Sequence, residues 1–387
     1  MENLLHYIFQ KFVGPSFSVS FPSGRTETYG TNKPILHVHF LTQKALSKTI
    51  FQLSLGFGES YMDGEILVDG PLDRLMEIDH ANAGRLPQWL ISTLAPVRNI
   101  NVKHNQSKQI QHHYDLGNDF YKLWLDPTMT YTCAYFKSPG DSLEKAQLQK
   151  LDHVLAKLQL KKGMRLLDIG SGWGQLLLRA AEKYDVECYG VTLSREQHKL
   201  SNAKARDNKL KGKVRYHLQN YQDIPQSEKF DRIVSIGMFE AVGRDNLSDY
   251  FKALSTHLKD GGLSLLHTIT KDNTSPTSAW VDKYIFPGGY IPAVKEVVSQ
   301  LHDFRLELTD YENLRFHYAL TLDEWRSNFE KHIPEITRMY DERFVRMWRL
   351  WLASASGSFR YGENSLSQFV FTKGKNSELM QTRDFLY

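Results

Sequence analysis

Residues 166–174 read Leu-Leu-Asp-Ile-Gly-Ser-Gly-Trp-Gly, and this stretch decides the fold. An apolar run that ends in three closely spaced glycines predicts a buried strand, a tight turn and the start of a helix. Glycine lets the backbone turn sharply and approach a ligand, because no Cβ intervenes. The N–H groups at the start of the following helix favour an electron-rich partner. The stretch therefore predicts a nucleotide-type cofactor site on an α/β sheet.

The spacing of the glycines distinguishes between binding sites for two kinds of cofactor. Dinucleotide-binding enzymes carry G-x-G-x-x-G, with an acidic residue about 20 positions further on that binds the ribose. Here Gly170, Gly172 and Gly174 are spaced G-x-G-x-G, and Thr192 stands near the end of the next predicted strand. The sequence therefore favours S-adenosylmethionine (SAM) over a nicotinamide cofactor. A purely structural strand-to-helix turn is the alternative interpretation.

Length and composition narrow the class of protein. The chain has 387 residues, more than one hydrophobic core usually organises, so we expect two domains. Its 48 Lys and Arg against 44 Asp and Glu are too slight an excess to indicate a nucleic-acid partner. With only Cys133 and Cys188, we expect no disulfide framework and a reducing compartment, the cytosol by default. No run reaches the roughly 18 apolar residues of a spanning helix, so we expect a protein that is soluble or at most peripheral to a membrane.

The first hundred residues differ in pattern from the rest and predict a small α+β domain. The expected elements are a hairpin over 17–28 with its turn at 22–25, a strand over 35–40, a short helix over 45–53, a glycine-punctuated segment over 56–70 and a helix from Pro71. A polar, lysine-dotted stretch over 99–111 has no periodicity. We therefore place the domains at 1–100 and 101–387.

Strand and helix patterns alternate in the second domain, which predicts a doubly wound, mostly parallel sheet. The expected strands are 164–169, 186–193, 214–218, 230–236 and 263–269, and the expected helices are 175–184, 195–208 and 247–258. Ligands of such sheets bind outside the carboxyl ends of the strands. The segments that follow the strands, namely 170–174, 192–194, 220–223, 237–240 and 267–269, should therefore converge on one crevice.

The first three of these segments suit a cofactor, and the last two carry groups that can do chemistry. The glycines can contact the methionine part of SAM, Thr192 and Gln197 its ribose, and Tyr221 and Gln222 its adenine. Glu240 and His267 are a carboxylate and an imidazole at neighbouring strand ends, where each can move a proton near neutral pH. Taken singly, Glu240 is equally well a carboxylate at a helix start and His267 a core histidine.

Several longer strings occur in a fixed order along the chain. They are Gly-Glu-Ser-Tyr-Met-Asp-Gly (58–64), His-Tyr-Asp-Leu-Gly-Asn-Asp-Phe-Tyr (113–121), Tyr-Thr-Cys-Ala-Tyr (131–135), Gly-Val-Thr-Leu-Ser (190–194) with Gln197, Met-Phe-Glu (238–240) and Tyr-Ile-Phe-Pro-Gly-Gly-Tyr (284–290). With the glycine loop, they resemble the cyclopropane-fatty-acyl-phospholipid synthases, a family that includes the mycolic acid cyclopropane synthases. The resemblance extends over both domains. It implies a class I SAM-dependent methyltransferase fold preceded by a smaller domain that engages lipid or membrane.

The resemblance also implies an activity. SAM would donate a methyl group to a cis double bond of a phospholipid acyl chain, and loss of a proton would close a cyclopropane ring. The implied partner is an unsaturated phospholipid in a bilayer, contacted peripherally at the inner face of the cell membrane, and the implied assembly is a homodimer. Two alternatives are a methyltransferase that leaves a methyl branch or methylates an amine, and a lipid-binding protein without activity.

Residue roles follow from the same resemblance, and no metal is among them. A bound bicarbonate, the implied base, would be held by Glu240, His267, Tyr318, Cys133 and Ile269. The SAM pocket would comprise Tyr131, Thr132, Asp168, Gly170, Gly172, Gly174, Thr192, Leu193, Gln197, Tyr221 and Gln222. Aromatic faces that stabilise the cation would come from Tyr114, Phe239, Tyr284 and Tyr290, although most aromatic residues of any chain belong to the core.

Two departures from the family pattern bear on mechanism. Many members have a cysteine shortly before a Gly-x-Phe-Arg string, but Ala355 stands at that place before residues 357–360. This excludes a covalent thiol mechanism at that site. Asn220 stands where many relatives have Asp or Gly, so the adenine contacts stay open.

Two segments are candidates for membrane contact. Residues 195–215 are rich in Lys and Arg, which predicts either a solvated helix face or a surface for anionic lipid headgroups. An apolar stripe at helical spacing, flanked by arginines, predicts a helix packed on the sheet more readily than an interfacial anchor. The stripe consists of Phe344, Met347, Trp348 and Trp351.

Overall fold

The computed structural model describes residues 1–83, 116–210, 212–380 and 382–386. The chain forms two compact units. The first unit combines residues 1–100 with 276–287 and 322–363, and the second combines 101–275, 288–321 and 364–387. The first unit is therefore assembled from three separate stretches of sequence. The boundary that we expected near residue 100 falls in a stretch outside the described residues.

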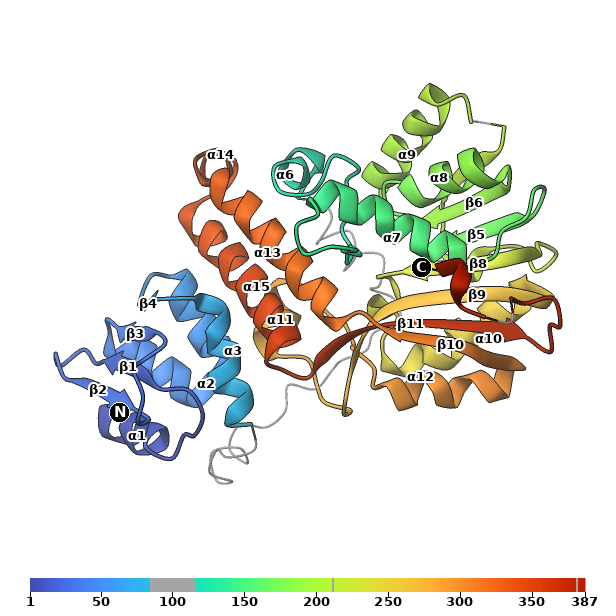
Figure 1. Cartoon of the computed structure of the whole chain (residues 1–387). Helices are drawn as coiled ribbons and strands as arrows, with labels where there is room; N and C mark the ends of the chain where they lie inside the picture. The colour runs from blue at the N-terminus through green and yellow to red at the C-terminus, as the bar shows by residue number, and fades with distance from the viewer. Residues whose placement is uncertain (84–115, 211, 381, 387) are drawn as a thin grey trace. The chain divides into compact units, whose positions relative to one another are not determined.

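A seven-stranded sheet forms the centre of the second unit, with the strand order β10-β11-β9-β8-β5-β6-β7 (Figure 1). The strands are β5 (Arg165–Ile169), β6 (Glu187–Thr192), β7 (Val214–Leu218), β8 (Phe230–Ile236), β9 (Leu258–Lys271), β10 (Leu306–Asn313) and β11 (Asn364–Lys373). The five strands from β7 to β9 pair in parallel, whereas β11 runs antiparallel to both β9 and β10. The mostly parallel, doubly wound sheet predicted from the sequence is confirmed.

Helices cover both faces of this sheet. Side chains alternate along β5, so Leu166 faces one hydrophobic cluster while Leu167 and Ile169 face the other. Helices α7, α8 and α9 contribute to the first cluster, and α10 and α12 to the second. Their bounds, with those of the short helices, are α6 (Asn118–Lys122), α7 (Leu143–Lys157), α8 (Gln175–Tyr184), α9 (Arg195–Asp207), η2 (Tyr221–Asp223), η3 (Phe239–Ala241), η4 (Arg244–Asn246), α10 (Leu247–His257), α12 (Val294–Leu301), η5 (His302–Phe304) and η6 (Asp384–Leu386).

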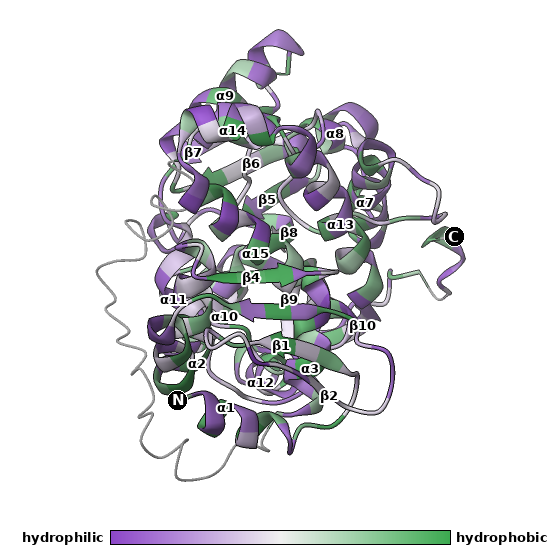
Figure 2. Cartoon of the chain, turned by 90° about the vertical axis from the view of Figure 1, so that its left-hand side faces the viewer, coloured by the Kyte–Doolittle hydropathy of each residue, from purple (hydrophilic) through white to green (hydrophobic). Residues whose placement is uncertain are grey.

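The bounds of the elements in the second unit agree closely with the ranges predicted from the sequence. The bounds of α8, β7 and β8 coincide with the predicted ranges. Strand β9 begins at Leu258, five residues earlier than predicted, because its first residue already pairs with Phe230 before the register shifts. Gly261 lies at φ +72° within this early part, so the sequence there resembles a turn although the backbone belongs to the strand. Figure 2 shows that α9 is mostly hydrophilic, as its basic sequence indicates.

A four-stranded sheet of order β2-β1-β3-β4 forms the base of the first unit. Its elements are α1 (Glu2–Phe9), β1 (Phe17–Ser20), β2 (Thr26–Tyr29), β3 (His37–Phe40), α2 (Gln43–Met62), β4 (Ile66–Asp69), η1 (Leu72–Arg74) and α3 (Leu75–Ala81), followed by α11 (Ala279–Tyr284), α14 (Ile333–Met339) and α15 (Glu342–Arg360). Helix α13 (Arg315–Lys331) spans the change from the second unit to the first. The predicted hairpin is the antiparallel pair of β1 and β2.

Helix α2 differs from the prediction, which ended the helix at Leu53. The helix continues to Met62 after a kink at Leu53, whose φ and ψ are 47° and −122°. Gly56 and Gly58 are helical, and each allows a close approach of a neighbour. A Cβ at Gly56 would lie 2.0 Å from the Lys48 carbonyl oxygen, and one at Gly58 would lie 2.2 Å from the Trp280 ring. These glycines permit close packing and do not mark a turn, which a single sequence does not reveal.

Helix α15 carries the apolar stripe and belongs to the core of the first unit. Trp348 is 1% exposed, and Met347 and Trp351 pack against the hydrophobic cluster of this unit. The stripe is therefore buried as predicted, but α15 packs mainly on η1, α2, α3 and α14 of the first unit and not on a sheet. The first residue of the Gly-x-Phe-Arg string, Gly357, has a packing role. A Cβ at this position would lie 2.3 Å from the Asp73 carbonyl oxygen. Within the described residues, no helix is long and apolar enough to span a membrane.

Candidate active site

The glycine loop after β5 adopts a backbone that only glycine adopts readily. Gly170, Gly172 and Gly174 have φ values of 89°, 53° and 89°. A Cβ at Gly170 would lie 2.7 Å from Met238, and one at Gly174 would lie 2.6 Å from the Tyr216 hydroxyl oxygen. A Cβ at Gly172 would meet no described atom within 4 Å. The outer two glycines therefore make room for protein neighbours, and the middle one faces open space.

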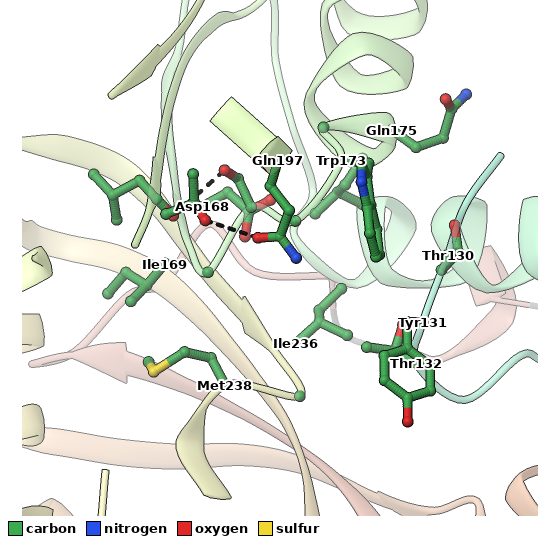
Figure 3. Close-up of a pocket in the computed structure, with 18 of the residues that line it drawn as sticks. Thr130, Tyr131, Thr132, Asp168, Ile169, Trp173, Gln175, Gln197, Ile236 and Met238 are labelled. Atoms are coloured by element: carbon green, nitrogen blue, oxygen red, sulfur yellow. Dashed lines mark hydrogen bonds between the residues drawn. The ribbon is translucent and has the colours of Figure 1, made fainter. Parts of the chain in front are cut away.

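This open space belongs to a pocket at the carboxyl ends of the central strands (Figure 3). The pocket is lined by Met129 to Thr132, Lys150, Leu151, Asp168 to Leu176, Val191 to Leu193, Gln197, Gln219 to Tyr221, Ile236 to Met238, Ala241 and Val242. Every residue predicted for the SAM pocket is among them except Gln222. The Gln222 side chain is exposed on η2, where its backbone N–H donates to the Asn220 Oδ1. Asn220 itself lines the pocket.

The start of α9 fixes Gln197 in the pocket wall. The Ser194 hydroxyl caps the helix by accepting a hydrogen bond from the Gln197 backbone N–H at 3.3 Å. The Thr192 hydroxyl donates to the Gln197 Oε1 at 2.8 Å. This bond uses the amide oxygen, so the amide nitrogen is the donor group that Gln197 retains for a ligand.

Helix α7 anchors the segment that carries Tyr131 and Thr132. The Gln147 side-chain amide donates to the carbonyl oxygens of Thr130 and Thr132 at 3.3 and 2.8 Å. One turn further along, the Lys150 ammonium donates to the Thr132 Oγ1 at 2.7 Å. Both side chains are buried, although polar residues on a helix usually indicate its solvent face. Sequence reasoning missed Gln147 and Lys150 for that reason.

Two buried charges lie in the pocket wall. Burial lowers the pKa of Lys150 to about 8 and raises the pKa of Asp168 to about 7. Each group reduces the shift of the other, because Lys150 stabilises the Asp168 carboxylate and Asp168 stabilises the Lys150 ammonium. Near neutral pH the pocket therefore holds a cation and an anion that both titrate close to physiological conditions.

Two buried polar residues follow neighbouring strands beside the pocket, and Glu240 is the first of them. Glu240 lies on η3, between the pocket-lining residues Met238 and Ala241. Its Oε1 accepts a hydrogen bond from the Ile269 backbone N–H at 2.7 Å, whereas its buried Oε2 has no hydrogen-bond partner in the described part of the chain. Burial raises the pKa of Glu240, and the Ile269 N–H partly offsets that effect. The structure thus joins two of the five residues predicted for the anion site.

His267 is the second of these residues, and Gln368 on the neighbouring strand determines which ring nitrogen carries the proton. Gln368 on β11 lies directly opposite His267 on β9, and its Nε2 lies 3.1 Å from the His267 Nδ1. Burial lowers the pKa of His267 well below its usual range, so the ring is neutral. Because the amide N–H donates to Nδ1, the ring proton resides on Nε2. This Nε2 is buried and has no partner among the described residues.

Hydrogen bonds connect the segment that follows Cys133 with the part of α13 that contains Tyr318. The backbone N–H of Ala134 donates to the Thr321 hydroxyl at 3.0 Å, and that of Phe136 donates to the His317 Nδ1 at 3.0 Å. Residues on both sides of Tyr318 thus hold the segment that follows Cys133. Burial raises the pKa of the Cys133 thiol, so this cysteine is neutral, which fits a contribution through its backbone.

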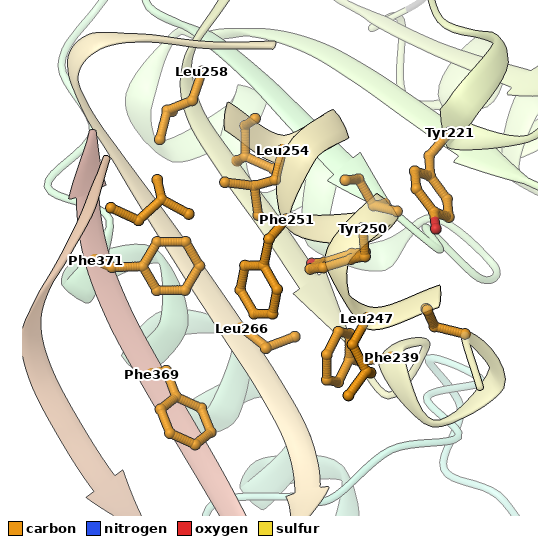
Figure 4. Packing of buried hydrophobic residues seen from close by; sticks show 14 of the residues in the cluster. Tyr221, Phe239, Leu247, Tyr250, Phe251, Leu254, Leu258, Leu266, Phe369 and Phe371 are labelled. Atoms are coloured by element: carbon orange, nitrogen blue, oxygen red, sulfur yellow. The ribbon is translucent and has the colours of Figure 1, made fainter. Parts of the chain in front are cut away.

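The aromatic residues predicted to face the substrate lie in different surroundings. The Phe239 ring is fully buried and packs edge to face against Tyr250 and Phe251 in the core (Figure 4). Tyr290 is also buried, and its backbone N–H donates to the Glu240 carbonyl oxygen at 2.8 Å. Tyr284 belongs to the first unit, where its hydroxyl donates to Glu59 at 2.9 Å. Tyr114 lies outside the described residues.

A seven-stranded sheet with one antiparallel strand, and a G-x-G-x-G loop at its carboxyl edge, define a class I SAM-dependent methyltransferase. The family model of mycolic acid cyclopropane synthetase matches residues 101–369, and the chain belongs to this family. A family model of a domain of unknown function matches residues 4–87.

Relatives over most of the chain support this assignment. The cyclopropane-fatty-acyl-phospholipid synthase of Escherichia coli K12 is 41% identical over 337 residues, which cover 85% of this chain and 86% of that protein. A probable fatty acid methyltransferase of Pseudomonas putida is 35% identical over 342 residues, with the same coverage. The solved structure of the mycolic acid cyclopropane synthase CmaA1 in complex with SAH and CTAB is 34% identical. It matches with a TM-score of 0.65 and covers 69% of this chain and 98% of that one.

Proposed function

We propose that this methyltransferase converts the cis double bond of an unsaturated phospholipid acyl chain into a cyclopropane ring. The family and the name of the Escherichia coli relative support this acceptor. The observation that carries the proposal is a pair of buried atoms without partners in the described chain, Glu240 Oε2 and His267 Nε2. They adjoin the SAM pocket, because Glu240 is flanked by pocket residues and the His267 carbonyl accepts from Gly237 N–H at 2.9 Å. Simple methyl transfer to a nucleophile does not need such a site.

The reaction makes specific demands on the chain. SAM, when bound, supplies an electrophilic methyl group. An alkene is a poor nucleophile, so the protein must hold the double bond in line with that methyl group and exclude water from the resulting lipid cation. One proton then leaves the transferred carbon, and its C–H electron pair closes the ring. The products are the cyclopropane lipid, S-adenosylhomocysteine (SAH) and a proton.

We propose that a bicarbonate ion serves as the base that receives this proton. The pair of Glu240 and His267 fits such an ion, since His267 Nε2–H can donate to an anion oxygen and Glu240 Oε2 can accept from the bicarbonate hydroxyl. Tyr318 and the backbone at Cys133 complete the proposed site. The Ile269 N–H is already bonded to Glu240 Oε1, so Ile269 contributes by orienting Glu240.

A second candidate function is methyl transfer that leaves a methyl branch on the acyl chain. The Pseudomonas putida relative, a probable fatty acid methyltransferase, favours it because it matches 85% of this chain. Both reactions pass through the same lipid cation and differ in which carbon loses the proton. A lipid-binding protein without activity is the remaining alternative.

One labelling experiment separates these functions. The protein is mixed with vesicles of cis-unsaturated phospholipid and SAM whose methyl group carries three deuteriums, and the acyl chains are analysed by mass spectrometry. A product that retains two deuteriums and resists hydrogenation is the cyclopropane. Retention of all three deuteriums identifies a methyl branch. SAM binding without any lipid product would contradict the proposed acceptor.

We further propose that the chain acts as a homodimer at the cytoplasmic face of a membrane. Exposed basic residues on and after α9 support electrostatic attraction to anionic headgroups, at about 1 kcal/mol each. They are Arg195, Lys199, Arg206, Lys209 and Arg215. Two nearby lysines are engaged within the protein, since Lys204 donates to the Thr128 carbonyl and Lys213 pairs with Asp185. The fraction of protein that sediments with anionic vesicles should fall steeply with added salt, and binding independent of charge would contradict the electrostatic contribution.

Analytical ultracentrifugation tests the proposed homodimer.

A further inference from the structure

The wall of the SAM pocket contains an ammonium group that forms no ion pair within the described part of the chain. Lys150 on α7 is 1% exposed, and its Nζ makes one hydrogen bond to the described chain, to the Thr132 Oγ1 at 2.7 Å. No described carboxylate lies within 4.0 Å of this nitrogen. An ammonium has three donors, and buried charges are normally paired. Lys150 is thus an incompletely satisfied cation in a cofactor pocket.

Asp168 presents the opposite charge in the same pocket. It lies on β5, two residues before the glycine loop, and is 3% exposed. Its carboxylate has no hydrogen bond or ion pair with the described residues, and it does not reach Lys150. The pocket therefore offers a separated cation and anion. An amino-acid zwitterion carries the two complementary charges, because its ammonium and carboxylate are attached to one carbon atom.

We propose that Lys150 positions the α-carboxylate of SAM by acting through the Thr132 hydroxyl, while Asp168 attracts the α-ammonium. Because Lys150 donates to Thr132 Oγ1, the hydroxyl proton of Thr132 is directed away from Lys150 and can donate to a carboxylate oxygen in the pocket. The ammonium also supplies the positive charge that a desolvated carboxylate requires. The proposal rests on SAM dependence and is independent of which acceptor the enzyme uses.

A purely structural role for Lys150 is the competing interpretation. The segment around Thr132 is, however, already anchored by Gln147, which donates to the carbonyl oxygens of Thr130 and Thr132. A buried neutral side chain would maintain the packing of α7 without the desolvation of a charge. The pKa of Lys150, lowered by burial, remains high enough for a protonated side chain at neutral pH. These observations favour a role in ligand recognition.

The test compares two ligands that differ only in the carboxylate. SAM and decarboxylated SAM are titrated by calorimetry into the full-length protein and into Lys150→Met. We expect the variant to bind SAM about 10- to 150-fold more weakly, as for loss of a charge-assisted hydrogen bond, and to bind decarboxylated SAM within about twofold of the wild type. Equal weakening for both ligands would show a structural role and overturn the proposal. Unchanged affinity for SAM would overturn it as well.

A second variant keeps the proposal testable if Lys150→Met does not fold. Thr132→Val preserves shape and removes the mediating hydroxyl, and it should also weaken binding of SAM more than that of decarboxylated SAM. If both variants fold, the double variant should lose no more SAM affinity than the weaker-binding single variant, because the two side chains act as one unit. Additive losses, or a Thr132→Val variant that does not distinguish the two ligands, would overturn the mediated contact.

Discussion

A methyl group added at Gly172 should weaken cofactor binding strongly while leaving the fold almost intact. Gly172 lies at φ +53°, and a Cβ there meets no described atom within 4 Å. The substitution Gly172→Ala therefore costs only the left-handed conformation, about 1–2 kcal/mol, which lowers the melting temperature by about 2–8 °C. In the complex, the methyl group would occupy the space that the loop leaves for SAM. Overpacking of about 1–3 kcal/mol corresponds to about 5- to 150-fold weaker binding.

Gly163→Ala is the matched control for this prediction. Gly163 lies at φ +80°, and a Cβ there also meets no described atom within 4 Å, but this residue does not line the pocket. Calorimetric titration with SAH and thermal unfolding are compared for both variants. We expect similar losses of stability and a loss of affinity only for Gly172→Ala. If Gly172→Ala bound SAH as tightly as the wild type, the assignment of the open space to the cofactor would be wrong.

Three further predictions concern the charged and polar groups of the site. Glu240→Gln should retain SAM affinity and slow cyclopropane formation at least about 100-fold, measured with deuterated SAM; unchanged turnover would exclude the proposed anion site. Gln368→Met should remove the preference of His267 for the Nε2–H tautomer, which ¹⁵N NMR reports directly, and raise the bicarbonate concentration needed for half-maximal activity. Retention of the tautomer would show that Gln368 does not set it. SAH affinity should be maximal between about pH 7 and 8. Asp168, with a pKa of about 7, loses its charge below this range, and Lys150, with a pKa of about 8, loses its charge above it. A flat affinity profile across this range and about one pH unit to either side would contradict both assignments.

The sequence predicted the parts of the molecule that depend on local pattern. The glycine loop, the strands around it and the start of α9 at Ser194 follow from spacing, periodicity and capping within short windows. The sequence predicts that Gly170 and Gly174 belong to a loop that contacts the cofactor. The close contacts that exclude a side chain there, with Met238 and Tyr216, involve residues that are distant in sequence.

Features that depend on distant partners were not predicted. Gln368 faces His267 only because β11 pairs with β9 across about a hundred residues, and alternation along either strand contains no information about that register. Lys150 shows the same limitation, since its burial comes from the tertiary packing of α7. The prediction ended helix α2 too early because its glycines are typical of a turn. In the structure their small size permits close contacts with Lys48 and Trp280.

The assembly of the first unit from three stretches of sequence has a consequence for biosynthesis. Its hydrophobic cluster includes Trp280, Ile285 and Leu350 together with residues from the first eighty positions. A ribosome that adds roughly 5–20 residues per second needs on the order of 15–60 s to proceed from α2 to α15. During that interval the apolar strands near the N-terminus emerge without the side chains that complete their core. Nascent chains of this protein should therefore depend on chaperones early in translation, and a fragment that ends before residue 276 should aggregate when it is expressed alone.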